Sequence, residues 1–314
     1  MFFLWICFSI SLCPSSRIKE TNDYEISINE CSFIGFISNE KGSVLYLDKS
    51  NFILLKVENS FFSSCFGNGV GAICFNCANG NSSFFSVCSR NTSYSNGVTH
   101  YSAAFAYILT SSKGNNNLEH VSCSRSCGLI SAIEIVKGIQ NIKGLNSSFN
   151  HMTYYSGIGI QQSSDCLFSF SCVSSNFAST HVIICMYNKL NMVSEFVNFC
   201  NNSQGSLSSW GLIANAITST SSISRWVFLN NNRYAFLFAN SDGTCSVHSC
   251  AVDFNYLSSQ VLISTPASYS NTYSVNLFGE KYCNVNQKTF MRQNPKSKSL
   301  YSFFVVLILN SHLL

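Results

Sequence analysis

The sequence predicts an all-β fold, a right-handed parallel β-helix (a solenoid) of about nine to ten rungs with three short strands in each. Strand-like runs recur along most of the chain, and the Ser-, Asn- and Gly-rich segments between them leave no room for a helix of about ten residues. The composition, with 46% hydrophobic and only 10% charged residues, disfavours helical bundles. The 27 Phe and 14 Tyr residues give the chain too much apolar surface to remain disordered.

Each repeat contains three strand-like elements. The first is an apolar run whose starts are roughly 24 to 32 residues apart, at residues 42–47, 71–75, 103–108, 131–136, 156–160, 181–186, 211–216, 235–239 and 259–264. The second is a short element that usually contains Phe, at residues 31–33, 59–62, 82–85, 146–149 and 226–228. The third alternates apolar and polar residues, at residues 52–57, 139–145, 166–170, 190–196 and 223–226. Three such elements in about 27 residues describe one rung of a β-helix.

A leucine-rich-repeat solenoid and a β-sandwich are the alternative folds. The leucine-rich pattern is missing, and a sandwich does not predict the same strand pair at a near-constant period. In a β-helix each inward side chain stacks on its equivalent in the next rung. We therefore expect Phe62 and Phe149 in the core, where a charged substitution is severely destabilising. We expect Ser and Asn at the corners, because they bond neighbouring backbone groups and tolerate left-handed conformations.

The amino-terminal residues predict a secretory leader. Residues 1–13 are almost wholly apolar and are followed by Pro14 and a polar segment, so we expect a signal peptide within residues 1–16. The alternative, an uncleaved anchor, is disfavoured because the run is shorter than the roughly 20 residues that a spanning helix needs.

The predicted β-helix covers residues 17–285, followed by a polar, basic linker at 286–299 and a hydrophobic tail at 300–314. Three interpretations of the tail remain open. It is a short membrane anchor flanked by Lys296 and Lys298, a glycolipid-anchor signal that is removed, or a last strand at the end of the fold.

The chain has 16 cysteines, an unusual number for a cytosolic protein. Loss of Cys7 and Cys13 with the leader leaves an even number that secretion would allow to pair. Cys31, Cys65 and Cys88 are expected at equivalent places of successive repeats, where thiols can also stack unpaired in a core. Disulfides and stacked free thiols are therefore both open.

Four sequons fit passage through a secretory pathway, and the candidate glycosylation sites are Asn81, Asn91, Asn146 and Asn201. The basic residues are scattered, so no nucleic-acid groove is expected.

No catalytic residue, cofactor or metal site is predicted. The two close cysteine pairs, Cys74 with Cys77 and Cys123 with Cys127, lack the further ligands of a zinc site. The best acidic pair for polysaccharide chemistry is Asp242 with Asp253, but Asp242-Gly243 is typical of a turn. An aromatic binding strip is the other candidate, from Tyr154, Tyr155, Tyr187, Trp210, Trp226 and Tyr256.

The segment Asn59-Ser-Phe-Phe-Ser-Ser-Cys65 and the following Gly69-Val-Gly-Ala-Ile-Cys-Phe75 resemble the F-x-x-N and G-G-A-I repeats of polymorphic outer-membrane-type proteins. The resemblance covers about residues 26–265 and is closer to the trichomonad-type protist members than to the chlamydial ones, which end in a β-barrel translocator. It implies a secreted or surface-anchored β-helix with a role in adhesion or host interaction.

The function that these observations predict is a non-enzymatic scaffold, secreted or at the cell surface, for adhesion to host or matrix partners. Its expected partners are extracellular proteins or glycans, and the tail is a candidate for attachment to the membrane. The alternatives are a carbohydrate-active β-helix enzyme of the lyase or hydrolase type, and a structural coat or truncated paralogue.

Overall fold

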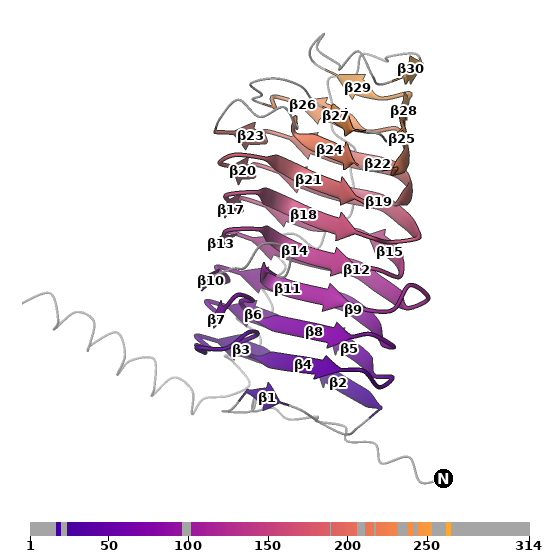
Figure 1. Ribbon diagram of the computed structural model, residues 1–314. Helices are drawn as coiled ribbons and strands as arrows, with labels where there is room; N and C mark the ends of the chain where they lie inside the picture. The colour runs from indigo at the N-terminus through magenta and orange to yellow at the C-terminus, as the bar shows by residue number, and fades with distance from the viewer. Residues whose placement is uncertain are drawn as a thin grey trace, which may run out of the picture.

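The computed structural model describes residues 17–19, 24–95, 102–188, 190–205, 211–216, 218–231, 238–241, 244–252 and 262–264. Within these residues the chain is all-β, without helices, and its parallel strands stack into a solenoid (Figure 1). The predicted β-helix is therefore confirmed as a parallel solenoid, while its right-handed winding and its number of rungs stay predictions. The leader, the linker and the tail lie outside the described residues.

One face of the solenoid is a nine-stranded parallel sheet, sheet A, formed mainly by the apolar runs. Its strands, in spatial order, are β1 (Ile18–Lys19), β4 (Leu45–Lys49), β8 (Ile73–Cys77), β11 (Ala103–Leu109), β14 (Ser131–Val136), β18 (Tyr155–Gln161), β21 (Val182–Tyr187), β24 (Ile213–Ala216) and β27 (Phe238–Ser241). The ninth predicted run ends in another sheet, because Leu262–Ser264 pairs with Ser246–His248.

The second and third predicted elements belong to one sheet, sheet B, which bends between them. Its strands are β2 (Glu25–Asn29), β3 (Ser32–Ile34), β5 (Leu54–Glu58), β6 (Phe61–Ser63), β9 (Asn81–Arg90), β12 (Asn115–Ser124), β15 (Ile139–Lys143), β16 (Asn146–Ser148), β19 (Asp165–Ser174), β22 (Asn191–Cys200), β25 (Thr220–Ser224), β26 (Val227–Leu229), β28 (Thr244–His248), β29 (Ala251–Val252) and β30 (Leu262–Ser264). At the bend the backbone is left-handed in every rung from Glu30 to Ser249.

The third face, sheet C, has no counterpart among the predicted elements. Its strands have two or three residues each: β7 (Phe66–Asn68), β10 (Ser93–Ser95), β13 (Cys127–Gly128), β17 (His151–Met152), β20 (Phe177–Ala178) and β23 (Ser203–Gln204). Segments this short show no alternation that could reveal them in the sequence.

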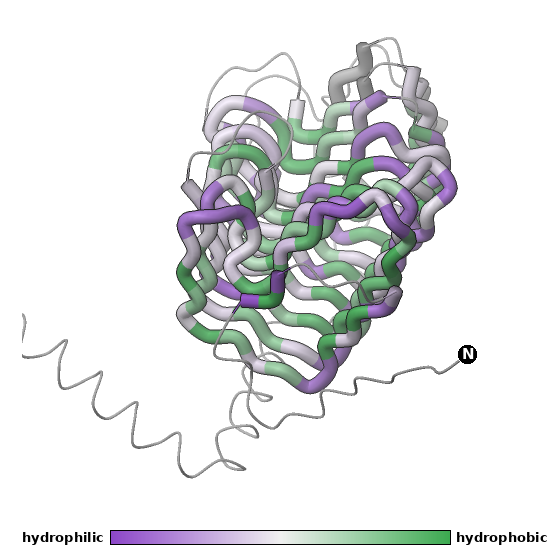
Figure 2. Tube along the Cα trace, turned by 60° about the horizontal axis from the view of Figure 1, so that its bottom comes forward, coloured by the Kyte–Doolittle hydropathy of each residue, from purple (hydrophilic) through white to green (hydrophobic). Residues whose placement is uncertain are grey.

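Inward side chains stack from rung to rung into one apolar core. Figure 2 shows hydrophobic residues recurring along the backbone of successive rungs. Phe62 is fully buried and stacks on Phe33 at a centroid distance of 4.9 Å, as predicted. The expectation for Phe149 is wrong: its side chain is 53% exposed, at a corner with φ 56°. The register aligns Phe62 with Ser89, Cys123 and Ser147, so the inward position in that rung is Ser147, two residues before Phe149.

The corner between sheets B and C has a buried polar ladder, as the Asn and Ser content predicts. A left-handed residue is followed in each rung by a ladder residue: Cys65, Thr92, Ser126, Asn150, Asn176, Asn202 and Asn231. The Oδ1 atom of each asparagine accepts the backbone N–H of the preceding rung's ladder residue, at 3.0–3.1 Å from Ser126 to Asn202. The side-chain amide donates to a backbone carbonyl of a sheet B strand, for example from Asn202 to the Val173 carbonyl of β19 at 2.8 Å.

Most described cysteines are buried free thiols. The free cysteines are Cys31, Cys65, Cys74, Cys77, Cys123, Cys127, Cys166, Cys172, Cys185, Cys200, Cys245 and Cys250, and Cys88 is disulfide-bonded. The expected equivalence of Cys31, Cys65 and Cys88 is wrong, because Cys31 aligns with Ser60 and Val87, Cys65 is in the corner ladder, and Cys88 pairs with Phe61. No helix within the described residues has the length and apolarity to cross a membrane.

Candidate functional site

The first candidate is the outer side of the first half of sheet B, hereafter the polar face. Parallel register aligns its outward residues into three columns of nine. The first column is Glu25, Leu54, Asn81, Asn115, Ile139, Asp165, Asn191, Thr220 and Thr244; the second is Ser27, Lys56, Ser83, Asn117, Asn141, Leu167, Val193, Ser222 and Ser246; the third is Asn29, Glu58, Phe85, Glu119, Lys143, Ser169, Glu195, Ser224 and His248. None of these side chains is buried.

Side chains of the polar face bond from one rung to the next. Asn191 Nδ2 donates to Asp165 Oδ1 at 3.1 Å, and Lys56 Nζ lies 2.7 Å from Glu25 Oε1. Such exposed pairs contribute little to stability, about 0–1 kcal/mol. Their effect is to hold a regular array of amides, hydroxyls and carboxylates at the spacing of adjacent strands, about 4.8 Å.

An apolar patch interrupts this array near its middle. Leu167 and Val193 are direct register partners and are 55% and 50% exposed. Beside them, at the bend of sheet B, Phe170 stacks on Phe196 at 5.1 Å and Arg225 lies over the Phe196 ring at 4.9 Å. Exposed apolar side chains on adjacent rungs, bordered by charges, are typical of an interaction surface.

The second candidate lies on the outer side of sheet A and centres on Glu134. Its neighbours on β14, Ile133 and Ile135, point into the core, so Glu134 points outward, yet its side chain is 0% exposed. In the register it is followed by Gly159 and then by Cys185. Gly159 leaves room for this carboxyl, because a methyl group in its place would force Oε2 of Glu134 to move.

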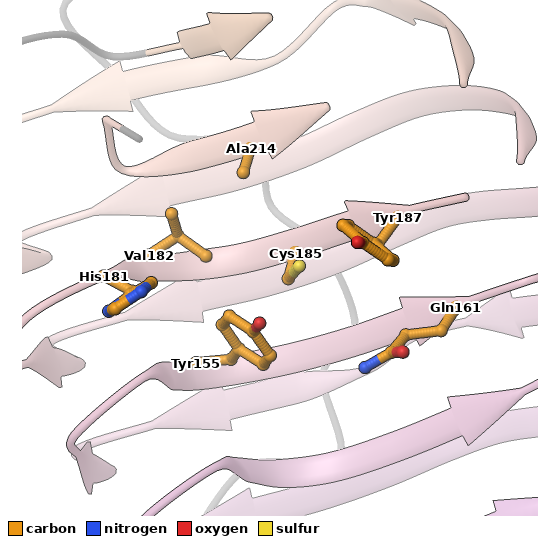
Figure 3. Close-up of a pocket in the computed structure, with 7 residues that line it drawn as sticks. All are labelled: Tyr155, Gln161, His181, Val182, Cys185, Tyr187 and Ala214. Atoms are coloured by element: carbon orange, nitrogen blue, oxygen red, sulfur yellow. The ribbon is translucent and has the colours of Figure 1, made fainter. Parts of the chain in front are cut away.

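A cavity of about 180 Å³ lies on sheet A, over β18 and β21 (Figure 3). It is lined by Tyr155 and Gln161 of β18, by His181 and the β21 residues Val182, Cys185 and Tyr187, and by Ala214 of β24. In Figure 3 the Tyr155 ring extends toward Cys185, and Gln161 lies at the opposite end of β18 from Tyr155. The Gln161 amide also donates a hydrogen bond to Oε1 of Glu134.

Burial governs the protonation of this cluster. It raises the pKa of Glu134 to about 7, against smaller opposing effects of hydrogen bonds from Ser131 and Gln161. It also raises the pKa values of the Tyr155 phenol and the Cys185 thiol, and it lowers the pKa of His181. Near neutral pH the phenol, thiol and imidazole are therefore uncharged, and Glu134 is the one group here that exchanges a proton.

The four sequons differ in accessibility. Asn91 and Asn201 are exposed at left-handed corners. Asn81 is half-buried and accepts a hydrogen bond from the backbone of Asn115 at 2.8 Å. Asn146 is buried, and its Nδ2 atom donates to Ser122 Oγ at 3.2 Å.

The other sequence candidates do not come together. Asp242 and Asp253 lie outside the described residues, as do Trp210 and Tyr256 of the aromatic strip. Trp226 is buried in the core, whereas Tyr154 and Tyr155 lie beside His181, and Tyr155 and Tyr187 line the cavity. Within the described residues no cluster of His, Cys, Asp or Glu is arranged to hold a metal ion.

Sequence reasoning missed Glu134 because it looked for paired carboxylates. The available signal was a single acidic residue inside the otherwise apolar strand Ser131–Val136, next to a Gly-x-Gly strand in the following repeat. Comparison with protein-family models, with curated proteins and with solved structures found no match for this chain.

Proposed function

We propose that this protein is a non-enzymatic interaction scaffold, secreted or at the cell surface, that binds extracellular proteins or glycans through the polar face. The observation that carries the proposal is the polar face itself, three columns of nine side chains without a buried member and with an exposed Leu167–Val193 patch. A repetitive surface of this kind gains affinity from area and multivalency.

The repeat motifs support the same proposal, since they resemble those of polymorphic outer-membrane-type proteins of protists. The apolar leader at residues 1–16 and the tail at 300–314 support a location outside the cytosol. Location is tested with an epitope tag after Arg17, by staining intact cells that express the full chain or a version truncated after Ser299. Surface signal that moves to the medium on truncation is the expected result, and a signal confined to the cytosol in both versions contradicts it.

Binding is tested with the purified chain on immobilised extracellular-matrix proteins and glycans. We expect binding to at least one of them, and a loss of at least tenfold in the double variant Leu167→Ser, Val193→Ser. The matched control is Ile37→Ser, which removes an exposed apolar side chain outside the polar face. Absence of binding to every probe, or equal binding by the double variant, would rule out the polar face as the binding surface.

A further inference from the structure

The outer side of the second half of sheet B differs from the polar face, although both belong to one sheet. Parallel register aligns one of its outward columns, hereafter the covered strip: Phe61, Cys88, Ser122, Asn146, Cys172, Asn198, Val227 and Ala251. All of these side chains except Cys172 are buried. Ser122 is 0% exposed, whereas Ser83, at an outward position of the first half of β9, is partly exposed.

The strip is outside the main core. The residues that alternate with it, among them Phe62 and Val173, point into that core, whereas Phe61 and Cys88 form a small apolar cluster of their own. All the described strands belong to the three sheets that form the wall of the solenoid, so none of them lies over the strip. Burial of an outward column therefore calls for a cover from another part of the chain or from a partner.

Cys88, within the strip, identifies the cover. It is disulfide-bonded, and the 12 other described cysteines are all free, so its partner is outside the described residues. The remaining cysteines of the chain are Cys7, Cys13 and Cys283. Cys7 and Cys13 are in the predicted leader, which is removed on secretion. Cys283 is the cysteine that a secreted chain retains.

The length of chain after the last described strand is sufficient. Cys283 follows Ser264, the end of β30, by 19 residues, which span up to about 63 Å when extended. Along sheet B, β30 is seven strands from β9, or about 34 Å at the usual spacing of about 4.8 Å. Residues 265–283 can therefore run over the strip and reach Cys88.

The composition of this segment fits the strip. Residues 265–279 contain no charged side chain, and their Ser, Asn and Thr residues alternate with Tyr, Val, Leu and Phe. The covered strip is also uncharged, with apolar positions such as Phe61 and Val227 and polar ones such as Asn198. An uncharged segment can cover such a strip without the cost of burying an unpaired charge.

We propose that residues 265–283 lie along the covered strip and are attached there by a disulfide between Cys283 and Cys88. The two thiols form one S–S bond and lose two protons and two electrons, which reduce a protein disulfide of the secretory pathway to a dithiol. The inference rests on the proposed function only for this oxidising compartment. It otherwise goes beyond that function, because the strip is separate from the polar face.

The attachment is tested by peptide mapping of the unaltered, purified full chain. Thiols are blocked with iodoacetamide in urea without reduction, and trypsin with chymotrypsin then releases Cys88 in residues 86–90 and Cys283 in residues 283–288, each without a second cysteine. We expect these two peptides as one linked species that separates on reduction. An alkylated Cys88, or Cys88 linked to Cys7 or Cys13, would overturn the proposal. A secreted chain with an alkylated Cys88 would overturn this proposal alone, since the staining of intact cells tests location independently.

The cover is tested by labelling the native protein with iodoacetamide over time. Cys200, a buried thiol at an outward position beside the strip, should react at least tenfold faster in Cys283→Ser than in the unaltered chain. Cys127→Ser is the matched control, because it removes an exposed thiol elsewhere and should leave the rate at Cys200 unchanged. Cys123 points into the core and should stay unlabelled in both variants if they are folded. Equal rates at Cys200 in the two variants would contradict the cover, and the peptide map decides the attachment even if Cys283→Ser does not fold.

Discussion

Asn202 holds Asn176 by two hydrogen bonds at once: its Oδ1 atom accepts the backbone N–H at 3.1 Å and the side-chain amide at 3.2 Å. Its own amide donates to the Val173 carbonyl at 2.8 Å. Each link of the corner ladder thus satisfies buried backbone groups of the adjacent rungs, which would otherwise be costly to bury.

Asn202→Ala should therefore destabilise the protein by about 2–4 kcal/mol, because it removes the acceptor of the Asn176 N–H and the donor to the Val173 carbonyl in a buried corner. Urea denaturation measures the free energy of unfolding. Asn141→Ala, on the exposed polar face, is the control and should stay within about 0.5 kcal/mol of the wild type. Equal losses for both variants would mean that the ladder contributes nothing beyond an ordinary asparagine.

Two phenylalanines with similar sequence surroundings should differ sharply in their contribution to stability. Phe62→Ala removes a fully buried ring that stacks on Phe33, at a cost of about 3–5 kcal/mol. Phe149→Ala removes an exposed ring whose contact is with Arg125, 5.6 Å from its centroid, and should cost less than about 1 kcal/mol. Thermal unfolding of the two variants side by side measures the difference. Similar losses of stability would contradict the register that places Ser147, and not Phe149, in the inward column of Phe62.

Removal of the Glu134 carboxyl should change how stability depends on pH. Its pKa is raised from 4.5 to about 7 on folding, so the folded state binds more protons than the unfolded state between these values. Stability contributed by this group is present below about pH 4.5 and is lost as the pH rises to about 7. The free-energy difference between Glu134→Gln and wild type should therefore shift by up to about 3 kcal/mol in favour of the variant between pH 4.5 and pH 8. A constant difference across this range would show that the carboxyl titrates normally.

Glycosylation should distinguish the sequons if the chain is secreted. Asn91 and Asn201 are exposed, and we expect glycans on both after expression in a eukaryotic secretory system. Asn146 should be unmodified in the folded product, because its amide nitrogen is buried against Ser122. Glycopeptide mass spectrometry measures the occupancy of each site, and a glycan on Asn146 in properly folded protein would contradict its placement.

Thiol reactivity should separate two neighbouring cysteines. Cys127 is exposed, whereas Cys123 is buried and burial raises its pKa to about 12. Brief treatment of the native protein with iodoacetamide should therefore modify Cys127 and leave Cys123 intact, and both should react in urea. Peptide mass spectrometry gives the extent of each reaction; rapid native labelling of Cys123 would mean that the core around this thiol opens readily to solvent.

The predicted fold depends on strong local patterns, and its errors come from rungs of unequal length. The apolar run at residues 131–136 coincides with β14, since six consecutive buried positions leave a clear mark in the sequence. Successive rungs, however, are 34 residues apart between Ser82 and Asn116 but 24 between Ser122 and Asn146. The motif spacing alone therefore aligns Phe149 with Phe62. In the structure the residue of that rung that shares the inward column of Phe62 is Ser147.

The candidate sites are less accessible to sequence reasoning than the fold. The composition predicts a long polar surface, but which residues share it depends on the register of nine successive strands of sheet B. The burial of the Glu134 carboxyl involves a glycine one rung away, and a linear sequence does not reveal that Gly159 leaves room for that carboxyl.

The corner ladder also implies an order of unfolding. In a chain whose rungs contact only their neighbours, cooperativity is set by the strength of each interface, as in a one-dimensional Ising model. Thiol and hydroxyl side chains occupy the ladder at Cys65, Thr92 and Ser126, whereas amides occupy it from Asn150 to Asn231. An unfolding front that starts at the amino-terminal rungs would therefore meet its first strong barrier at Asn150, and hydrogen exchange should slow abruptly there.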